Sequence, residues 1–136
     1  MRLAANTGCT LHLIEPLGFA LDDGKLRRAG MDYRERAVMR VHADLETWLE
    51  QHDGAVYAFS NQGTTTYTEV DYRPSDALLF GPESVGLPEE IMQAAFVTAL
   101  VRIPMQPEVR SLNLANAAAV ATYEAWRQNG FATATP

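Results

Sequence analysis

Short apolar runs alternate with helical patterns along this chain, and this alternation constrains its fold more than any other feature. Such an order predicts βα units, in which helices join parallel strands and cover the sheet. A length of 136 residues suits one domain with one core. We therefore expect an α/β fold with a mainly parallel sheet flanked by helices. Strands are expected at residues 11–14, 38–41, 55–59, 76–80 and 101–103, and helices near 22–29, at 44–49, from Pro88 onward and at about 113–129.

Capping residues indicate where some of the expected helices begin and end. Asp44 precedes a helical pattern and is a preferred N-cap residue. Ser111 is expected to cap the long helix over 113–129, and Gly130 is expected to end it. Residues 132–136 are expected to form a disordered tail.

Composition limits the classes of protein to which the chain can belong. A formal net charge of -6 argues against a general nucleic-acid binder, although a local basic patch can still contact RNA phosphates. The single cysteine, Cys9, excludes an internal disulfide and a multi-cysteine zinc site. The histidines have no metal-site spacing, so we expect no metal. No apolar run is long enough to cross a bilayer and no secretory pattern opens the chain, which favours a cytoplasmic protein.

The segment 79–88, Leu-Phe-Gly-Pro-Glu-Ser-Val-Gly-Leu-Pro, follows one candidate strand and precedes a helix. It would lie at the carboxyl end of the sheet, where α/β proteins usually bind ligands. Gly81 and Gly86 allow the backbone to approach a ligand, Pro82 stiffens the turn, and Glu83 is an acid among small residues. Taken alone, the segment is better explained as an ordinary loop with a surface glutamate.

The segment 102–116 leads from the last candidate strand into the long helix. Two prolines shape the exit from the strand, and the start of a helix offers free N–H groups to a carboxylate or phosphate. Taken alone, a well-capped amphipathic helix explains this segment. Neither segment belongs to a Gly-x-Gly-x-x-Gly fingerprint or a P-loop, which makes a nicotinamide or ordinary Rossmann site a weak hypothesis.

The two segments are specific in their ordered combination. Phe-Gly-Pro-Glu-x-x-Gly-Leu-Pro, Ile-Pro-Met, Ser-Leu-Asn-Leu-Ala-Asn-Ala and Tyr-Glu-Ala-Trp-Arg-Gln follow one another between residues 80 and 128. This order resembles the second and third motifs of the SPOUT methyltransferases. Within that superfamily it is similar to the small tRNA wobble-position cytidine/uridine 2′-O-methyltransferases. The likeness continues through segments 5–8, 11–19 and 26–33, and so covers nearly the whole chain.

The resemblance implies a fold, a cofactor and a reaction. Members form a single α/β domain, here residues 1–131, whose C-terminal segment threads into a deep trefoil knot, a rare exception to chain topology. They bind S-adenosylmethionine among three loops of the knot and methylate the ribose 2′-hydroxyl of the tRNA wobble nucleotide. The resemblance also implies a homodimer formed through the C-terminal helix, on which Tyr123 lies.

The resemblance also assigns candidate site residues. The implied cofactor site comprises Phe59, Gly81, Pro82, Glu83, Gly86, Ile103, Met105, Ser111 and Leu112. The implied catalytic group comprises Arg2, Glu83, Ser111 and Asn113. The expected RNA contacts are Lys25, Arg27, Arg28 and Arg110, for which a solvated helix face is the other explanation. Two roles stay open for Arg2, activation of the hydroxyl or phosphate positioning, because a guanidinium is a poor base.

The resemblance further implies a strand and a Pro-x-Asn-x-Gly-Asn motif just upstream of Arg2, where this sequence has only Met1. Without that strand, neighbouring sheet edges would be unpaired, so we expect reduced stability and an uncertain activity for this form. Two alternative functions follow. One is a SPOUT enzyme that modifies another RNA site, and the other is an RNA-binding or dimerisation module that keeps the knot but has lost turnover.

Overall fold

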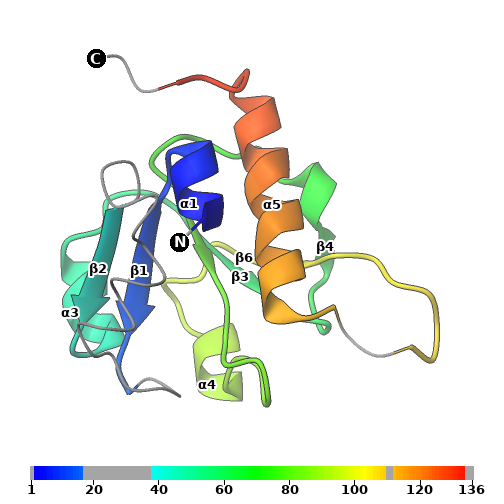
Figure 1. The fold of residues 1–136 in the computed structure, drawn as a ribbon. Helices are drawn as coiled ribbons and strands as arrows, with labels where there is room; N and C mark the ends of the chain where they lie inside the picture. Colours follow the sequence, from blue (N-terminus) through cyan, green and yellow to red (C-terminus); the bar gives the residue numbers. More distant parts are fainter. Residues whose placement is uncertain (1, 17–37, 110–111, 134–136) are drawn as a thin grey trace. The chain divides into compact units, whose positions relative to one another are not determined.

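The structure, a computed structural model, describes residues 2–16, 38–109 and 112–133. Helices and parallel strands form two compact units, which are described separately (Figure 1). The first unit comprises Met1–His52 with Thr133–Pro136, and the second comprises Asp53–Ala132. The expected α/β class with parallel strands and flanking helices is confirmed. The helix expected near 22–29 lies outside the described residues.

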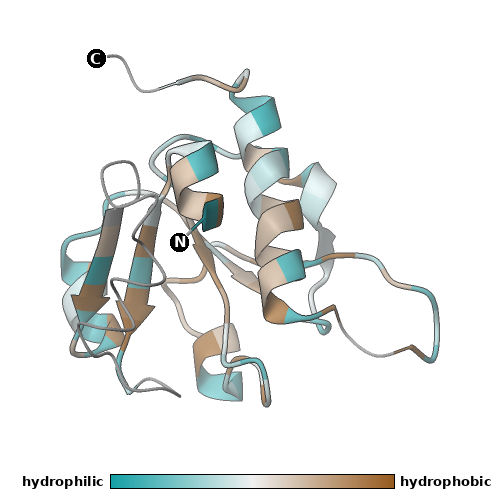
Figure 2. Cartoon of the chain, viewed as in Figure 1, coloured by the Kyte–Doolittle hydropathy of each residue, from teal (hydrophilic) through white to brown (hydrophobic). Residues whose placement is uncertain are grey.

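The first unit contains a parallel pair of strands. β1 (Thr10–Ile14) and β2 (Val38–His42) pair along their whole lengths, from Thr10↔Val38 to Ile14↔His42. Both strands carry apolar and polar residues, as the colours of Figure 2 show. Strands were expected at 11–14 and 38–41 from short apolar runs, and both are present.

A short helix, α1 (Arg2–Thr7), precedes β1 and was not expected from the sequence. Its buried residues are Ala4 and Thr7. Gly8 follows with a φ of 76° and donates its N–H to the Ala4 carbonyl, which ends the helix. A helix of 6 residues is too short to be stable by itself, so its formation depends on packing rather than on local pattern.

The helix α3 (Leu45–Glu50) begins at Asp44, as expected. The Asp44 carboxylate accepts hydrogen bonds from the hydroxyl and the backbone N–H of Thr47, both at 2.7 Å. These two bonds lower the pKa of Asp44, because they stabilise its charged form. The helix directs Trp48 inward, where this side chain is buried.

His12 and His52 contact the Trp48 ring, and His42 contacts His12. His12 Nδ1 and His42 Nε2 lie 2.9 Å apart, a hydrogen-bond distance. The Trp48 ring stacks on His52 at a centroid distance of 4.6 Å and contacts His12 at 5.9 Å. Within the described ranges, no group of His, Cys, Asp and Glu residues could hold a metal ion. The contacts described for these three histidines are with aromatic rings and with one another.

The second unit contains a parallel sheet in the order β4-β6-β3-β5. Its strands are β3 (Val56–Phe59), β4 (Thr65–Thr66), β5 (Ala77–Leu79) and β6 (Ala99–Arg102). The last strand, β6, therefore lies between β3 and β4, which both precede it in the chain. The two-residue strand β4 was not expected, because so short a strand has no period to detect.

The last strand lies earlier in the chain than the sequence indicated. The prediction of 101–103 was wrong at both ends, since β6 covers Ala99–Arg102. Ala99 pairs with Tyr57 of β3, which extends the ladder toward the N-terminus. Ile103 has left the sheet and lines a cavity instead. Its apolar character reflects that cavity and not a strand position.

The helices of the second unit are η1 (Tyr67–Glu69), a 3-10 turn, then α4 (Glu89–Met92) and α5 (Leu114–Gln128). α4 follows Pro88, as expected. The prediction that Ser111 caps the long helix was wrong, because Asn113 is the N-cap. The Asn113 side chain accepts a hydrogen bond from the Asn116 N–H at 2.8 Å, directly before the first helical residue. Ser111 itself lies outside the described residues. No helix in the described ranges is long and apolar enough to span a membrane.

The core of the second unit joins the sheet to α5. Its buried members are Phe59, Val70, Tyr72, Val101 and Ala121. The Tyr72 hydroxyl donates to the Tyr67 carbonyl at 2.7 Å. Burial raises the pKa of Tyr72 well above its usual value, so the phenol stays protonated and keeps this bond.

Candidate functional site

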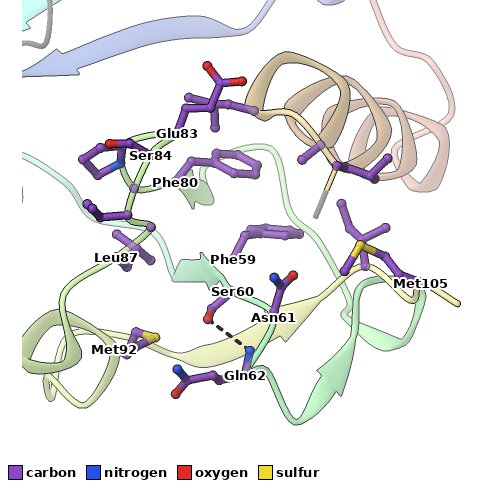
Figure 3. A pocket seen from close by; sticks show the side chains of 18 residues that line it. Phe59, Ser60, Asn61, Gln62, Phe80, Glu83, Ser84, Leu87, Met92 and Met105 are labelled. Atoms are coloured by element: carbon purple, nitrogen blue, oxygen red, sulfur yellow. Dashed lines mark hydrogen bonds between the residues drawn. The ribbon is translucent and has the colours of Figure 1, made fainter. Parts of the chain in front are cut away.

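A cavity of about 370 Å³ lies at the carboxyl ends of β3, β5 and β6, within the second unit. Three loops border it (Figure 3): the first loop is residues 60–64, the second is 80–88, and the third is described over 103–109 and 112–113. They meet because parallel strands place their carboxyl ends at one edge of a sheet. The volume falls in the range of roughly 300–1,000 Å³ that is typical of small-molecule sites.

The residues expected to hold a cofactor come together here. Every one of them that the structure describes lines the cavity: Phe59, Gly81, Pro82, Glu83, Gly86, Ile103, Met105 and Leu112. Ser111, the remaining member, and Arg110 beside it lie outside the described residues. The structure therefore brings into one place residues that are widely separated in the sequence. Their part in cofactor binding stays a prediction.

Two phenylalanine rings form one wall of the cavity. Phe59 and Phe80 stack with a centroid distance of 4.8 Å and an interplanar angle of 20°. Phe59 ends β3 and belongs to the buried core, so this wall is anchored to the sheet. Ile103 and Met105 of the third loop add apolar surface. Such a wall suits a flat heteroaromatic ring.

The second loop folds tightly on itself. The Gly86 N–H donates to the Pro82 carbonyl at 2.8 Å. A Cβ atom added at Gly81 would lie 2.3 Å from the Gly86 carbonyl carbon and from the Leu87 nitrogen. Only glycine therefore fits at Gly81, and the backbone itself forms this part of the cavity surface.

A polar rim on the first loop was missed by the sequence analysis. Ser60, Asn61 and Gln62 line the cavity, although none of them was among the expected site residues. The Gln62 N–H donates to the Ser60 hydroxyl at 3.1 Å, a bond drawn in Figure 3. Their place directly after a buried strand was the available signal, because ligands bind at that end of a parallel sheet. The other lining residues not expected are Phe80, Ser84, Val85, Leu87, Met92, Leu114 and Ala117.

The candidate catalytic residues occupy different places. Glu83 lines the cavity and is exposed, and Figure 3 shows its carboxylate pointing away from the two phenylalanine rings. Asn113 is exposed at the N-cap of α5 and does not line the cavity, although Leu112 and Leu114 on either side of it do. Arg2 begins α1 in the first unit. Their catalytic roles stay predictions, as do the RNA contacts Lys25, Arg27, Arg28 and Arg110, which lie outside the described residues.

Comparison with known proteins gives a consistent family. The model of the SpoU rRNA Methylase family matches residues 1–123. The chain is 51% identical over 133 residues to a protein of Saccharophagus degradans named tRNA (cytidine(34)-2′-O)-methyltransferase. That match covers 97% of this chain and 86% of the relative.

Solved structures give the same result. One, described as "Structural insights into the 2-OH methylation of C/U34 on tRNA", is 49% identical with a TM-score of 0.85. It covers 95% of this chain and 84% of the other. A SpoU methyltransferase from Streptomyces viridochromogenes, solved in complex with AdoMet, is 27% identical with a TM-score of 0.76. That similarity covers 96% of this chain and 54% of the other.

Proposed function

The chain belongs to the SpoU rRNA methylase family, and we propose that it methylates the ribose 2′-hydroxyl of nucleotide 34, the wobble cytidine or uridine, in tRNA. The methyl donor is S-adenosylmethionine, which a structural neighbour binds. The observation that carries the proposal is the convergence of three strand-end loops on one cavity, which contains the described residues of the family's cofactor motifs. The proposal is also supported by the relative named tRNA (cytidine(34)-2′-O)-methyltransferase, whose match covers 97% of this chain.

The residues of the cavity fit this cofactor. Phe59 and Phe80 offer an aromatic wall to the adenine, and the glycine backbone of the second loop allows close approach. The polar side chains of Ser60, Asn61 and Gln62 can bond ribose hydroxyls or the amino-acid end. When bound, S-adenosylmethionine supplies a methyl group on a positively charged sulfur.

The chain itself must orient the ribose hydroxyl and assist loss of its proton. We assign this work to Arg2, Glu83, Ser111 and Asn113. Among the described members of this group, Glu83 lines the cavity. Its exposed carboxylate can accept a hydrogen bond from the ribose 2′-hydroxyl. Arg2 serves either the hydroxyl or a phosphate, and its permanent charge favours the phosphate.

Larger-scale features belong to the same proposal. We propose that residues 1–131 act as a single domain, because the family model spans both compact units. The proposal includes the C-terminal trefoil knot that the resemblance implies, and the order β4-β6-β3-β5 is compatible with it. We also propose a cytoplasmic enzyme, with residues 132–136 as a tail.

The proposed partners are tRNA and a second copy of the chain. Lys25, Arg27, Arg28 and Arg110 would contact RNA phosphates, which the overall charge of -6 otherwise repels. The homodimer would form through α5, where the large side chains of Val120 and Tyr123 are exposed. Apolar side chains exposed on one helix are a common signature of a protein interface.

Methyl transfer to unmodified tRNA, with the modified nucleoside mapped, tests the proposal. We expect one 2′-O-methyl group at nucleotide 34 and none on ribosomal RNA in a parallel reaction. A methyl group at another RNA position would indicate a different SPOUT enzyme. Cofactor and tRNA binding without any transfer would instead indicate an inactive binding module.

A further inference from the structure

The side chain of Gln128 joins the last turn of α5 to the backbone of the segment 70–72. Its Oε1 accepts from the Tyr72 N–H at 2.9 Å, and its Nε2 donates to the Val70 carbonyl at 2.9 Å. One amide therefore satisfies a donor and an acceptor of the same segment, as a neighbouring strand would. Hydrogen bonds of this length hold both groups in fixed directions.

Neighbouring side chains on α5 hold Gln128 in this orientation. Gln128 Nε2 also donates to Glu124 Oε2 at 2.9 Å. Arg127 binds the same carboxylate with Nε at 2.8 Å from Oε1 and Nη2 at 2.9 Å from Oε2. The bond from Arg127 lowers the pKa of Glu124, which therefore stays charged and able to accept. Asn129 adds a bond from Nδ2 to the Tyr72 carbonyl at 3.2 Å.

The side chains that α5 contributes to the core of the second unit are small. Ala121 is fully buried in the core and Ala125 packs against it. Alanine has no long side chain to interlock with a neighbour, so hydrogen bonds elsewhere on the helix can add to what fixes its position. The directional hydrogen bonds of Gln128 constrain the position of α5 relative to the segment 70–72.

Both elements that Gln128 joins lead to the cavity. α5 carries Leu114 and Ala117 on the cavity wall, the latter about 16 Å from Gln128 along a helix that rises about 1.5 Å per residue. Val70 and Tyr72 share one core cluster with Phe59, which forms another part of the wall. A shift of α5 against the segment 70–72 would therefore change the spacing between these two walls.

We propose that Gln128 is a positioning residue for the cofactor cavity, which holds α5 against the segment 70–72 at the spacing that S-adenosylmethionine requires. The inference rests on the proposed function of the cavity. Gln128 touches neither the cavity nor a reacting group, so its effect is on affinity for the cofactor.

Gln93 provides a matched control. It lies directly after α4 and its Nε2 donates to Glu89 Oε1 at 3.1 Å, the same side-chain bond that Gln128 makes to Glu124. Gln93 is exposed and does not line the cavity. Gln128→Leu and Gln93→Leu therefore each remove a side-chain bond to a glutamate. Gln128→Leu also removes the two hydrogen bonds to the backbone of the segment 70–72.

The first experiment measures the Kd for S-adenosylmethionine and for S-adenosylhomocysteine by calorimetry, with melting temperatures taken alongside. We expect Gln128→Leu to weaken both affinities about tenfold, equal to about 1.4 kcal/mol, and Gln93→Leu to leave them unchanged. In steady-state kinetics, KM for the cofactor should rise more than kcat falls. A lower melting temperature with unchanged Kd would overturn the inference and leave a merely structural role.

A second variant, Gln128→Glu, tests the hydrogen bond that Gln128 Nε2 donates to the Val70 carbonyl. It also replaces the leucine variant if that variant does not fold. Its carboxylate can accept from the Tyr72 N–H but cannot donate to the Val70 carbonyl, and it would face the charged Glu124. Protonation restores the donor. Its cofactor affinity relative to the unsubstituted chain should therefore recover as the pH falls from about 8 to about 5.5.

Gln93→Glu should show no such recovery, and a flat ratio for Gln128→Glu would overturn the inference. If the unsubstituted chain binds neither S-adenosylmethionine nor S-adenosylhomocysteine, the proposed function fails instead. The two failures are therefore distinguishable, because one concerns the variants and the other the chain itself.

Discussion

Gly81 shows how a single residue can determine the shape of the cavity in the second unit. Replacing it by alanine places a Cβ atom 2.3 Å from backbone atoms of Gly86 and Leu87, which must move apart. We expect Gly81→Ala to cost about 1–3 kcal/mol of stability, as overpacking does, and to weaken S-adenosylmethionine binding by about tenfold or more. Thermal unfolding and calorimetry measure the two effects.

Gly86→Ala is the control for this prediction. Gly86 has a φ of 71°, and nothing lies within 4 Å of an added Cβ atom. The substitution should cost roughly 1–2 kcal/mol through backbone conformation alone, with a smaller loss of cofactor affinity. Equal losses of affinity in the two variants would show that the close approach at Gly81 is unimportant for binding.

Asn113 caps α5, and a second, catalytic role is proposed for it, so substitution can separate the two. Its side chain caps α5, so Asn113→Ala should cost about 1 kcal/mol of stability, whereas aspartate can still cap. The amide donors of asparagine are lost in both variants. We expect both to lose methyl transfer, with only the alanine variant lowering the melting temperature. Unchanged methyl transfer by Asn113→Asp would contradict the catalytic role of Asn113 and leave capping of α5 as its function.

Residue types in sequence order predicted part of the candidate site and missed another part. Gly81 and Pro82 stood in a motif, so they were recognisable before any geometry was known. Ser60, Asn61 and Gln62 form a polar turn of a common kind, and only their position at the sheet edge links them to the cavity. Local chemistry does not reveal that position.

At the level of elements, periodicity predicted α3 and α5 best, although the N-cap of α5 is Asn113 and not Ser111. α5 and α3 have clear period and end signals, and both form almost where expected. β6 was misplaced because the apolar character of Ile103 was read as a strand position. A residue buried in a cavity and a residue buried in a sheet have the same polarity, so sequence does not distinguish them.

The pair β1 and β2 should lose stability in acid. Burial first, then the positive groups His42, Arg40 and His52, lower the pKa of His12. Folding therefore favours the neutral ring, and stability is complete above the unfolded pKa of about 6.5 and falls as the pH drops below it. Thermal unfolding between about pH 8 and about pH 5 should show a decreasing melting temperature.

The acid groups of α3 and its cap do not reverse this effect. Asp44 is engaged with Thr47, and Glu46 and Glu50 are exposed. His12→Asn removes the titrating ring, so its melting temperature should depend less on pH over the same range. An unchanged pH dependence in that variant would assign the acid sensitivity to other groups.

On the scale of the whole molecule, the exposed face of α5 predicts self-association. Val120 and Tyr123 are 37% and 42% exposed and lie three residues apart, on one face of α5. We expect Tyr123→Asp to shift the molecular mass from dimer to monomer, because an interface does not accept an unpaired charge. Light scattering after gel filtration measures that mass.

Val41→Asp is the matched control, since Val41 is 43% exposed and lies on β2, away from α5 in the chain. This variant should keep the mass of the unsubstituted chain. A monomeric unsubstituted chain would contradict the proposed dimer directly. A dimer that survives Tyr123→Asp would place the interface elsewhere.

The sequence by itself determined the α/β class, most element positions and the motifs of the second and third loops, because periodicity, capping and turn chemistry are local properties. The tertiary structure decided what depends on distant partners: the order β4-β6-β3-β5, the short strand β4, and the meeting of Phe59 with Phe80. It also decided the bonds from Gln128 to Val70 and Tyr72, which join residues 56 and 58 positions apart. Such contacts arise only when the sheet forms, since no local pattern encodes which strand ends will be neighbours.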